Sequence, residues 1–181
     1  VGAADGSPGV QRYLENSNVL ETRFKTDTGS FRVIDLAPRY IQYDRLFRPT
    51  QLTRVIEPLD GSPRVKVQCL PKLGWSKQTP QVLQGSNHLR YEGFQSQLRL
   101  TTDIPLSYIN GQPFTLNQRQ HLVLTWGPPV EEALSPLCEK QTNETLRYWR
   151  RWVKGCNIPP VYQQEVIRSA LVLKLHCFED T

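Results

Sequence analysis

The sequence predicts a mainly β protein in which an antiparallel β-sandwich is followed by two α-helices. Residues 12–127 contain many short segments rich in β-branched and aromatic residues, separated by turns, a spacing typical of an antiparallel sandwich or barrel. After Pro136 the hydrophobic period changes from two to between three and four. The chain has 181 residues, enough for one domain with a real core.

The first predicted hairpin joins residues 19–26 to residues 30–36 through a turn at 27–29. Residues 30–36 alternate, but both sets of side chains are largely apolar, so we expect this strand to be covered on both faces. Asp35 lies on this otherwise apolar strand and is expected to be a buried, hydrogen-bonded structural carboxylate rather than a catalytic one.

The same pattern of strand and turn continues to Gly127. Residues 52–57 and 64–70 are predicted strands on either side of a turn at Asp60-Gly61, and the alternation in 64–70 indicates one wet face. The remaining predicted strands are 88–91, 97–101, 106–109, 114–116 and 121–126. Asn110-Gly111 is expected to form the turn between 106–109 and 114–116.

Two helical segments follow. Residues 143–154 place apolar side chains on one stripe and Arg147, Arg150, Arg151 and Lys154 on or near the other face, with a cap at Thr142 or Asn143 and Gly155 after the end. Pro159-Pro160 interrupts the chain, and residues 162–178 again show helical spacing with a wide apolar face. We therefore expect a sandwich domain over residues 1–138, and the two helices over residues 139–181.

Composition narrows the possible functions. The net charge of +5 is spread along the chain, so it argues for neither nucleic-acid nor membrane binding. Cys69, Cys138, Cys156 and Cys177 are widely separated and no His stands near them at zinc-like spacing, so we expect no metal or cofactor and buried reduced thiols, with a disulfide as the alternative. Together with the absence of a signal peptide, the cysteines favour the cytoplasm.

Four segments, in order along the chain, carry a resemblance to the N-terminal region of glycoside hydrolase family 15, the bacterial and archaeal glucoamylases and trehalase-like enzymes. They are Arg12-Tyr13-Leu14 with Asn18 to Thr22, Val33 to Pro38, Thr145 with Tyr148-Trp149-Arg150 and Trp152, and Val166 to Leu171 with Leu173-Lys174-Leu175.

The resemblance implies a large sandwich of the supersandwich kind, a linker helix, and then the first helix of an (α/α)6 catalytic barrel. Such enzymes hydrolyse α-glucosides with inversion, using one glutamate as general acid and another as general base. The opening glycine-serine-isoleucine-aspartate-tryptophan and proline-arginine-phenylalanine-aspartate runs of the family are missing here. Neither catalytic glutamate maps onto this chain, so we assign no catalytic residue.

The candidate functional residues are therefore contacts rather than catalysts. Trp75, in the loop from Pro71 to Pro80, is the best candidate for stacking on a sugar ring. The candidates for packing against the barrel are Trp149, Trp152, Val166, Ile167, Leu171 and Phe178. We expect Glu131-Glu132 to lie in a solvated loop, and the isolated His88, His121 and His176 to have structural or surface roles.

The leading hypothesis is a non-catalytic domain that packs on, and helps to shape, the barrel of an α-glucoside hydrolase acting on trehalose or on malto- or isomalto-oligosaccharides. The absence of Met and the abrupt end after a patterned segment favour a fragment. One alternative is a free-standing carbohydrate-binding sandwich that depends on Trp75. Another is a polyanion-binding module that uses the basic face of residues 147–154. We expect no nucleic-acid or membrane partner, and the oligomeric state stays open.

Overall fold

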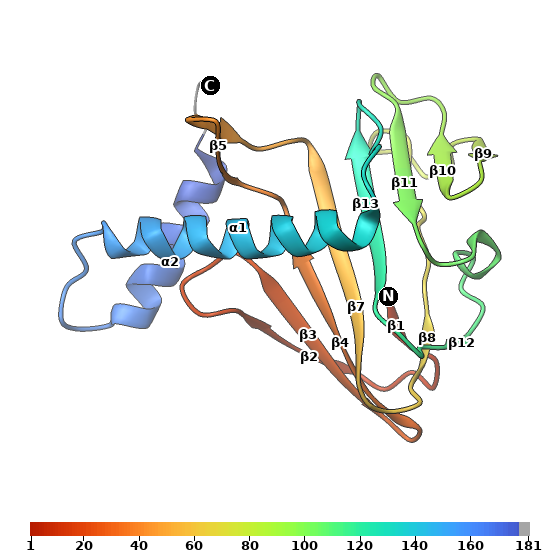
Figure 1. The fold of residues 1–181 in the computed structure, drawn as a ribbon, viewed down its shortest axis with the longest axis horizontal. Helices are drawn as coiled ribbons and strands as arrows, with labels where there is room; N and C mark the ends of the chain where they lie inside the picture. Colours follow the sequence, from red (N-terminus) through yellow and green to blue (C-terminus); the bar gives the residue numbers. More distant parts are fainter. Residues whose placement is uncertain (178–181) are drawn as a thin grey trace.

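The structure, a computed structural model, describes residues 1–177 and is built on one antiparallel sheet of eight strands (Figure 1). In spatial order the strands are β2 (Gly9–Tyr13), β3 (Leu20–Thr26), β4 (Gly29–Leu36), β7 (Gln51–Gly61), β13 (Gln120–Trp126), β11 (Leu98–Thr102), β10 (His88–Tyr91) and β9 (Val82–Gln84). Within residues 1–177 two α-helices follow the strands, and no sheet closes into a barrel. The predicted mainly β class is confirmed.

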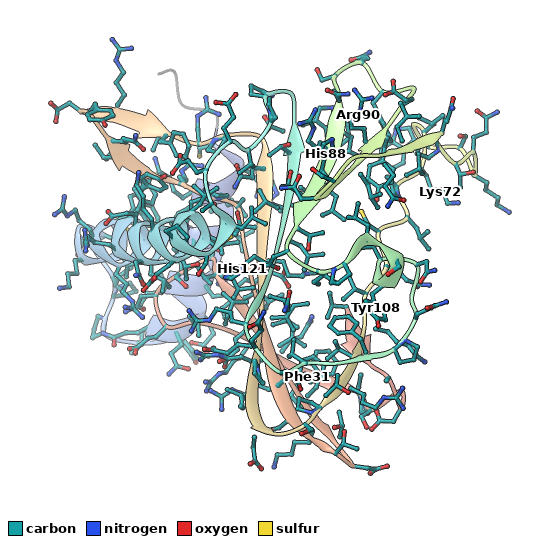
Figure 2. All side chains as sticks on the ribbon, turned by 45° about the vertical axis from the view of Figure 1, so that its right-hand side comes forward. Phe31, Lys72, His88, Arg90, Tyr108 and His121 are labelled. Atoms are coloured by element: carbon teal, nitrogen blue, oxygen red, sulfur yellow. The ribbon has the colours of Figure 1, made fainter. Side chains whose placement is uncertain are left out.

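A small second sheet makes the sandwich. It consists of β1 (Gly2–Ala3), β8 (Arg64–Lys66) and β12 (Phe114–Thr115). The larger of two hydrophobic cores next to the main sheet lies between it and this small sheet, and it includes Phe31, Ile56, Val65 and Leu98. Figure 2 labels Phe31, which is fully buried there, and Tyr108, which packs at the margin of the same core.

Helix α1 (Leu134–Lys154) crosses the opposite face of the main sheet (Figure 1). Beneath it lies a second core that includes Val19, Ile34, Val123 and Cys138. Strand β4 serves both cores, because Phe31 and Val33 point into the first and Ile34 and Leu36 into the second. The prediction that this strand is covered on both faces is confirmed.

Helix α2 (Gln163–His176) packs against α1 through a third apolar cluster of Trp149, Val153 and Leu171. A separate hairpin of β5 (Tyr40–Gln42) and β6 (Arg45–Phe47) projects beyond the main sheet and packs on α1. Its turn residues Tyr43 and Asp44 have φ of 50° and 57°, as expected when both turn positions of a hairpin are left-handed.

Several strand predictions are confirmed. The first hairpin pairs Thr26 with Gly29, and β10 pairs with β11 from His88–Thr101 to Tyr91–Leu98. The predicted strand 64–70 is shorter, ending at Lys66, and it does not pair with β7. Both edges of β7 are already taken by β4 and β13, so the chain crosses to the small sheet. Gly61 makes that crossing with φ +64°, where a Cβ would lie 2.6 Å from the carbonyl oxygen of Thr28.

Two predictions are wrong. Residues 106–109 form no strand; Leu106–Tyr108 is a short 3-10 helix, η1, which Pro105 starts and which the hydrogen bond from Tyr108 N–H to Pro105 O closes at 2.9 Å. Helix α1 begins at Leu134 rather than at the predicted cap near Thr142, because Pro136 falls in the first turn, where a proline does not break a helix. The predicted boundary at residue 138 therefore falls inside α1.

Candidate functional site

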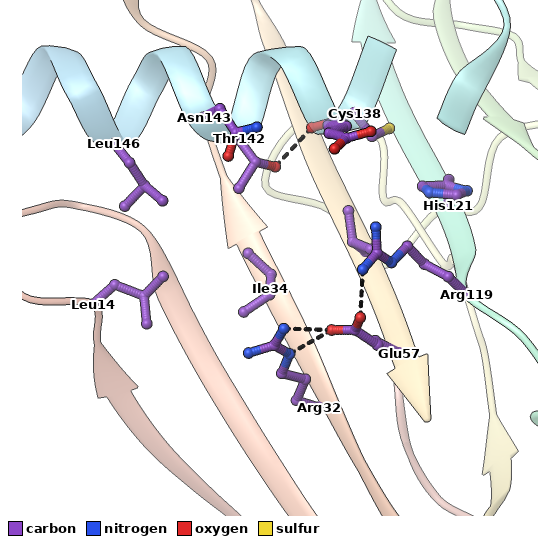
Figure 3. Close-up of a pocket in the computed structure, with 12 residues that line it drawn as sticks. Leu14, Arg32, Ile34, Glu57, Arg119, His121, Cys138, Thr142, Asn143 and Leu146 are labelled. Carbon is purple, nitrogen blue, oxygen red and sulfur yellow. Dashed lines mark hydrogen bonds and ion pairs between the residues drawn. The ribbon is translucent and has the colours of Figure 1, made fainter. Parts of the chain in front are cut away.

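A cleft of about 330 Å³ opens between α1 and the sheet face beneath it (Figure 3). Strands β4, β7 and β13 form its floor. Its lining residues are Leu14, Arg32, Ile34, Val55, Glu57, Arg119, His121, Cys138, Glu139, Thr142, Asn143 and Leu146. The volume falls at the low end of the range of about 300–1,000 Å³ for small-molecule sites, and the mixture of apolar walls with a few polar groups is typical of them.

Glu57 joins two arginines in this cleft. The guanidinium of Arg32 donates to Glu57 Oε2 from Nε at 2.6 Å, and Arg119 Nη2 pairs with Glu57 Oε1. Burial by itself raises the pKa of Glu57, but the hydrogen bonds from Arg119 and Arg32 and their charges outweigh it, so the pKa lies below its ordinary value. Glu57 therefore stays ionised near neutral pH, and it suits a fixed ion pair better than proton donation.

The ion pairs continue across the sheet to Glu21, whose side chain is 1% exposed. Cross-strand neighbours supply its partners: Arg12 Nε lies 2.6 Å from one carboxylate oxygen, Arg23 Nε 3.0 Å from the same oxygen, and Arg32 Nη1 3.4 Å from the other. Burial raises the pKa of Glu21, and the hydrogen bonds from Arg23 and Arg12 lower it by more, so the net shift is downward. We call Arg12, Glu21, Arg23, Arg32, Glu57 and Arg119 the charged ladder.

His121 and Cys138 form the inner end of the cleft. The Asp103 carboxylate accepts the backbone N–H of His121 at 2.7 Å and lies 2.6 Å from its Nδ1, which fixes the imidazole in place. Burial, and to a smaller degree the charge of Asp103, raises the pKa of the Cys138 thiol to about 12, so this thiol is no nucleophile near neutral pH. The structural role expected for His121 agrees with this arrangement.

Most of the predicted packing residues meet where α1 and α2 cross. Trp149 and Leu171 are buried there, and Trp152 and Ile167 pack against them while remaining partly exposed. Val166 is also partly buried. Phe178 lies outside the described residues.

Arg39, which the sequence analysis did not single out, is buried beside this cluster. Its guanidinium lies 5.6 Å from the Trp149 ring centroid and 5.7 Å from that of Tyr148, and its backbone N–H donates to Thr145 Oγ1 at 3.2 Å. In these contacts a cation lies over an aromatic face. Only the fold brings residue 39 to α1, so no local sequence signal could have found it.

Arg168 fastens α2 to the sandwich. Its guanidinium carbon lies 3.9 Å from the ring centroid of Tyr13, its Nη1 donates to Ser17 O at 2.9 Å, and its Nη2 donates to Asn18 Oδ1. Asn18 in turn donates from Nδ2 to Leu171 O at 2.9 Å. These contacts hold one side of α2 against the sandwich, and they therefore fix which residues lie on its opposite side.

That other side of α2 is apolar and exposed. Leu173 is 70% exposed, and Val172 and Leu175 are also exposed. Val161 and Tyr162, just before the helix, are exposed as well. Isolated exposed apolar residues are ordinary on protein surfaces, but a group of five on and beside one helix is typical of a surface that contacts another polypeptide.

Trp75 lies where the sequence placed it, in a loop, and its side chain is fully exposed. It lines neither the cleft under α1 nor the groove described below, so its sugar contact stays a prediction. Asp35 pairs with Arg54, with Oδ1 2.5 Å from Nε, which agrees with a hydrogen-bonded structural carboxylate, but its side chain is 27% exposed rather than buried.

The cysteines do not pair, and no metal cluster is visible. All four cysteines are free thiols, and only Cys138 is buried. Among residues 1–177, no group of three or more His, Cys, Asp or Glu side chains could hold a metal ion. No helix in this part of the chain is long and apolar enough to cross a bilayer.

The chain is 22% identical over 178 residues to a trehalase from Thermoplasma acidophilum, and the match covers 94% of this chain and 30% of the trehalase. The chain therefore spans less than a third of the length of the curated relative that it matches. No family model matches the chain. No solved structure matches it either.

Proposed function

We propose that this chain is the non-catalytic N-terminal domain of an inverting glycoside hydrolase of family 15 that acts on α-glucosides such as trehalose or malto- and isomalto-oligosaccharides. In this proposal α1 links the sandwich to a catalytic barrel, and α2 is the first helix of that barrel. The domain packs on the barrel and helps to shape it.

The exposed apolar side of α2 carries the proposal. One side of this helix is covered by α1 and fastened to the sandwich by Arg168, while Val172, Leu173 and Leu175 are left in water. A helix that is apolar on two sides normally has neighbours on two sides. The outer ring of helices in a barrel provides neighbours of that kind.

The distant similarity to a trehalase supports the same reading. The similarity covers 94% of this chain but only 30% of the trehalase. A non-catalytic role agrees with the state of the carboxylates in the cleft under α1. Inversion needs an acid and a base about 6.5–9.5 Å apart on opposite sides of the scissile bond, and Glu57 is held by arginines on both sides.

The experiment that tests the proposal measures whether the outer side of α2 is a binding surface. We expect the 181-residue chain to bind a hydrophobic dye and to self-associate, and we expect no hydrolysis of trehalose or maltose by this chain. A Leu173→Lys variant should lose most of the dye signal, while Leu59→Lys, which changes another exposed leucine far from α2 in sequence, should keep it. A monomeric chain that binds no dye contradicts the proposal.

A further inference from the structure

A second hollow, separate from the cleft under α1, lies where β13 ends and α1 begins. This groove has a volume of about 640 Å³, within the range of small-molecule sites. Residues from three stretches of chain line it, and they are Phe47, Pro49, Thr50, Gln51, Thr125, Trp126, Pro128, Pro129, Val130, Glu131, Glu132, Leu137 and Gln141. Nothing in the proposed packing of α2 uses it.

Two aromatic side chains of the groove are held by other aromatic rings. Trp126 is 42% exposed, and Phe94 packs edge-on against it with ring centroids 5.3 Å apart. Phe47 packs on buried Tyr40 with centroids 4.9 Å apart. Aromatic rings braced in this way lose little conformational freedom when a ligand packs on them.

The polar groups of the groove are also held in place. Gln51 Nε2 donates to Gln141 Oε1 at 2.8 Å and to Thr53 Oγ1 at 2.9 Å, and Thr53 Oγ1 donates to the same Gln141 oxygen at 2.8 Å. Gln141 is buried, so this network orients two amide groups at the groove. Thr125 also lines the groove, but it is 5% exposed, and its hydroxyl oxygen is buried without a hydrogen-bond partner among the described residues. That oxygen is therefore closed to a ligand in the groove.

The charge of the groove is the reverse of the charge of the whole protein. Glu131 and Glu132 line it, after the stiff Pro128-Pro129 pair, and of the described residues no Lys, Arg or His does. Burial, followed by the negative charges of Glu132 and Glu144, raises the pKa of Tyr40, whose ring packs on Phe47. Anionic ligands are disfavoured here, although the net charge of the chain is +5.

We propose that this groove binds a neutral oligosaccharide. The C–H face of a sugar ring packs on Trp126 or Phe47, ring hydroxyls donate to the carboxylates of Glu131 and Glu132, and the Gln51 side-chain carbonyl oxygen accepts from a further hydroxyl. Aromatic faces, fixed amides and carboxylate acceptors match a ligand that is apolar on one face and rich in hydroxyl groups at its rim. The choice of α-glucosides as the sugars rests on the proposed function.

The proposal is tested by NMR titration of the 181-residue chain with maltotriose and with trehalose, following the four indole Nε1–H resonances. We expect the Trp126 resonance to move and the Trp75 resonance to stay. Trp126→Ala should weaken binding by about tenfold or more, and Trp75→Ala should leave it unchanged.

Glu131→Gln guards against misfolding of the tryptophan variant. Because Glu131 is exposed, the change should leave Tm unchanged. We expect it to weaken sugar binding about threefold, since a charged acceptor is replaced by a neutral one. A Glu131→Gln chain that binds sugar as tightly as the parent overturns the proposal.

Two further results would also overturn the proposal that the groove binds sugar. If the Trp75 resonance moves and the Trp126 resonance does not, the sugar binds at the exposed loop rather than in the groove, and the proposal is overturned. No response to either sugar, with a response to a lysine-rich peptide at Trp126, replaces the sugar by a cationic partner and overturns the proposal as well. Dye binding at α2 is unaffected by each of these results, so failure of the groove and failure of the proposed function are distinguishable.

Discussion

The two helices differ in how they use their apolar residues. Helix α1 buries a continuous stripe of Leu137, Cys138, Gln141, Thr145, Trp149 and Val153 against the sheet and its neighbours. Helix α2 buries only Leu171 and leaves three large apolar side chains exposed. The described part of the chain covers the apolar side of α1 but only one of the two apolar sides of α2. We therefore regard α1 as part of the sandwich, and we expect another polypeptide surface at α2.

The largest effect is expected where the two helices meet. Trp149→Ala removes a fully buried indole that touches α2 and lies beside Arg39, and it should lower the free energy of unfolding by about 3–5 kcal/mol. Urea unfolding measures this loss. Arg151→Ala, on the exposed side of the same helix, is the control and should change stability by less than about 0.5 kcal/mol. A loss of less than about 1 kcal/mol for the Trp149 variant would contradict the view that α1 belongs to the core.

A smaller effect is expected for the single buried residue of α2. Leu171→Ala should cost about 2–3 kcal/mol, near the low end for a buried leucine, because the residue lies in the smallest of the three apolar clusters. Hydrogen exchange sharpens the comparison: amides of α2 should lose protection while those of β4 and β7 keep theirs. Equal loss of protection in both regions would mean that α2 and the sandwich open as one unit.

Acid should act on the sheet under α1 rather than on the fastening of α2. The pKa values of Glu21 and Glu57 are lowered in the folded chain, so their contribution to stability is present above the ordinary carboxyl pKa of about 4.3 and is lost as pH falls through the folded values. Arg168 binds uncharged oxygen acceptors, whose protonation does not change in this range. Denaturant midpoints between neutral pH and pH ~3 measure the loss.

Glu21→Gln identifies the source of that loss. Charged hydrogen bonds of this kind contribute about 1.5–3 kcal/mol, so the variant should be less stable at neutral pH by about 1–2 kcal/mol and should lose less on acidification. A variant with the same pH dependence as the parent would show that other carboxyl groups control acid stability.

The smallest effect on stability is expected on the exposed side of α2. Leu173→Lys should change the free energy of unfolding by less than about 0.5 kcal/mol, since the side chain is 70% exposed. The measurement that matters is sedimentation: the variant should be monomeric at concentrations where the parent associates. A large loss of stability instead would mean that Leu173 packs within this chain in solution.

Much of this architecture could be predicted from local patterns. Alternation predicted β3, β4, β10, β11 and β13, and the stripe of Trp149 and Trp152 predicted that this helix has an apolar packing face, because side-chain periodicity is a local consequence of backbone geometry. Helical spacing also predicted α2, while a second neighbour for this helix stays a prediction. Each of these depends on residues that are close together in the sequence.

Only the tertiary structure decided the relations between segments that are distant in the sequence. Strand β8 lies in the small sheet because both edges of β7 are occupied, and the charged ladder and the groove at Trp126 each combine several strands and loops. Glu131-Glu132, expected to be merely solvated, line that groove. Strand order and the joining of loops are set by long-range packing, which no window of neighbouring residues contains.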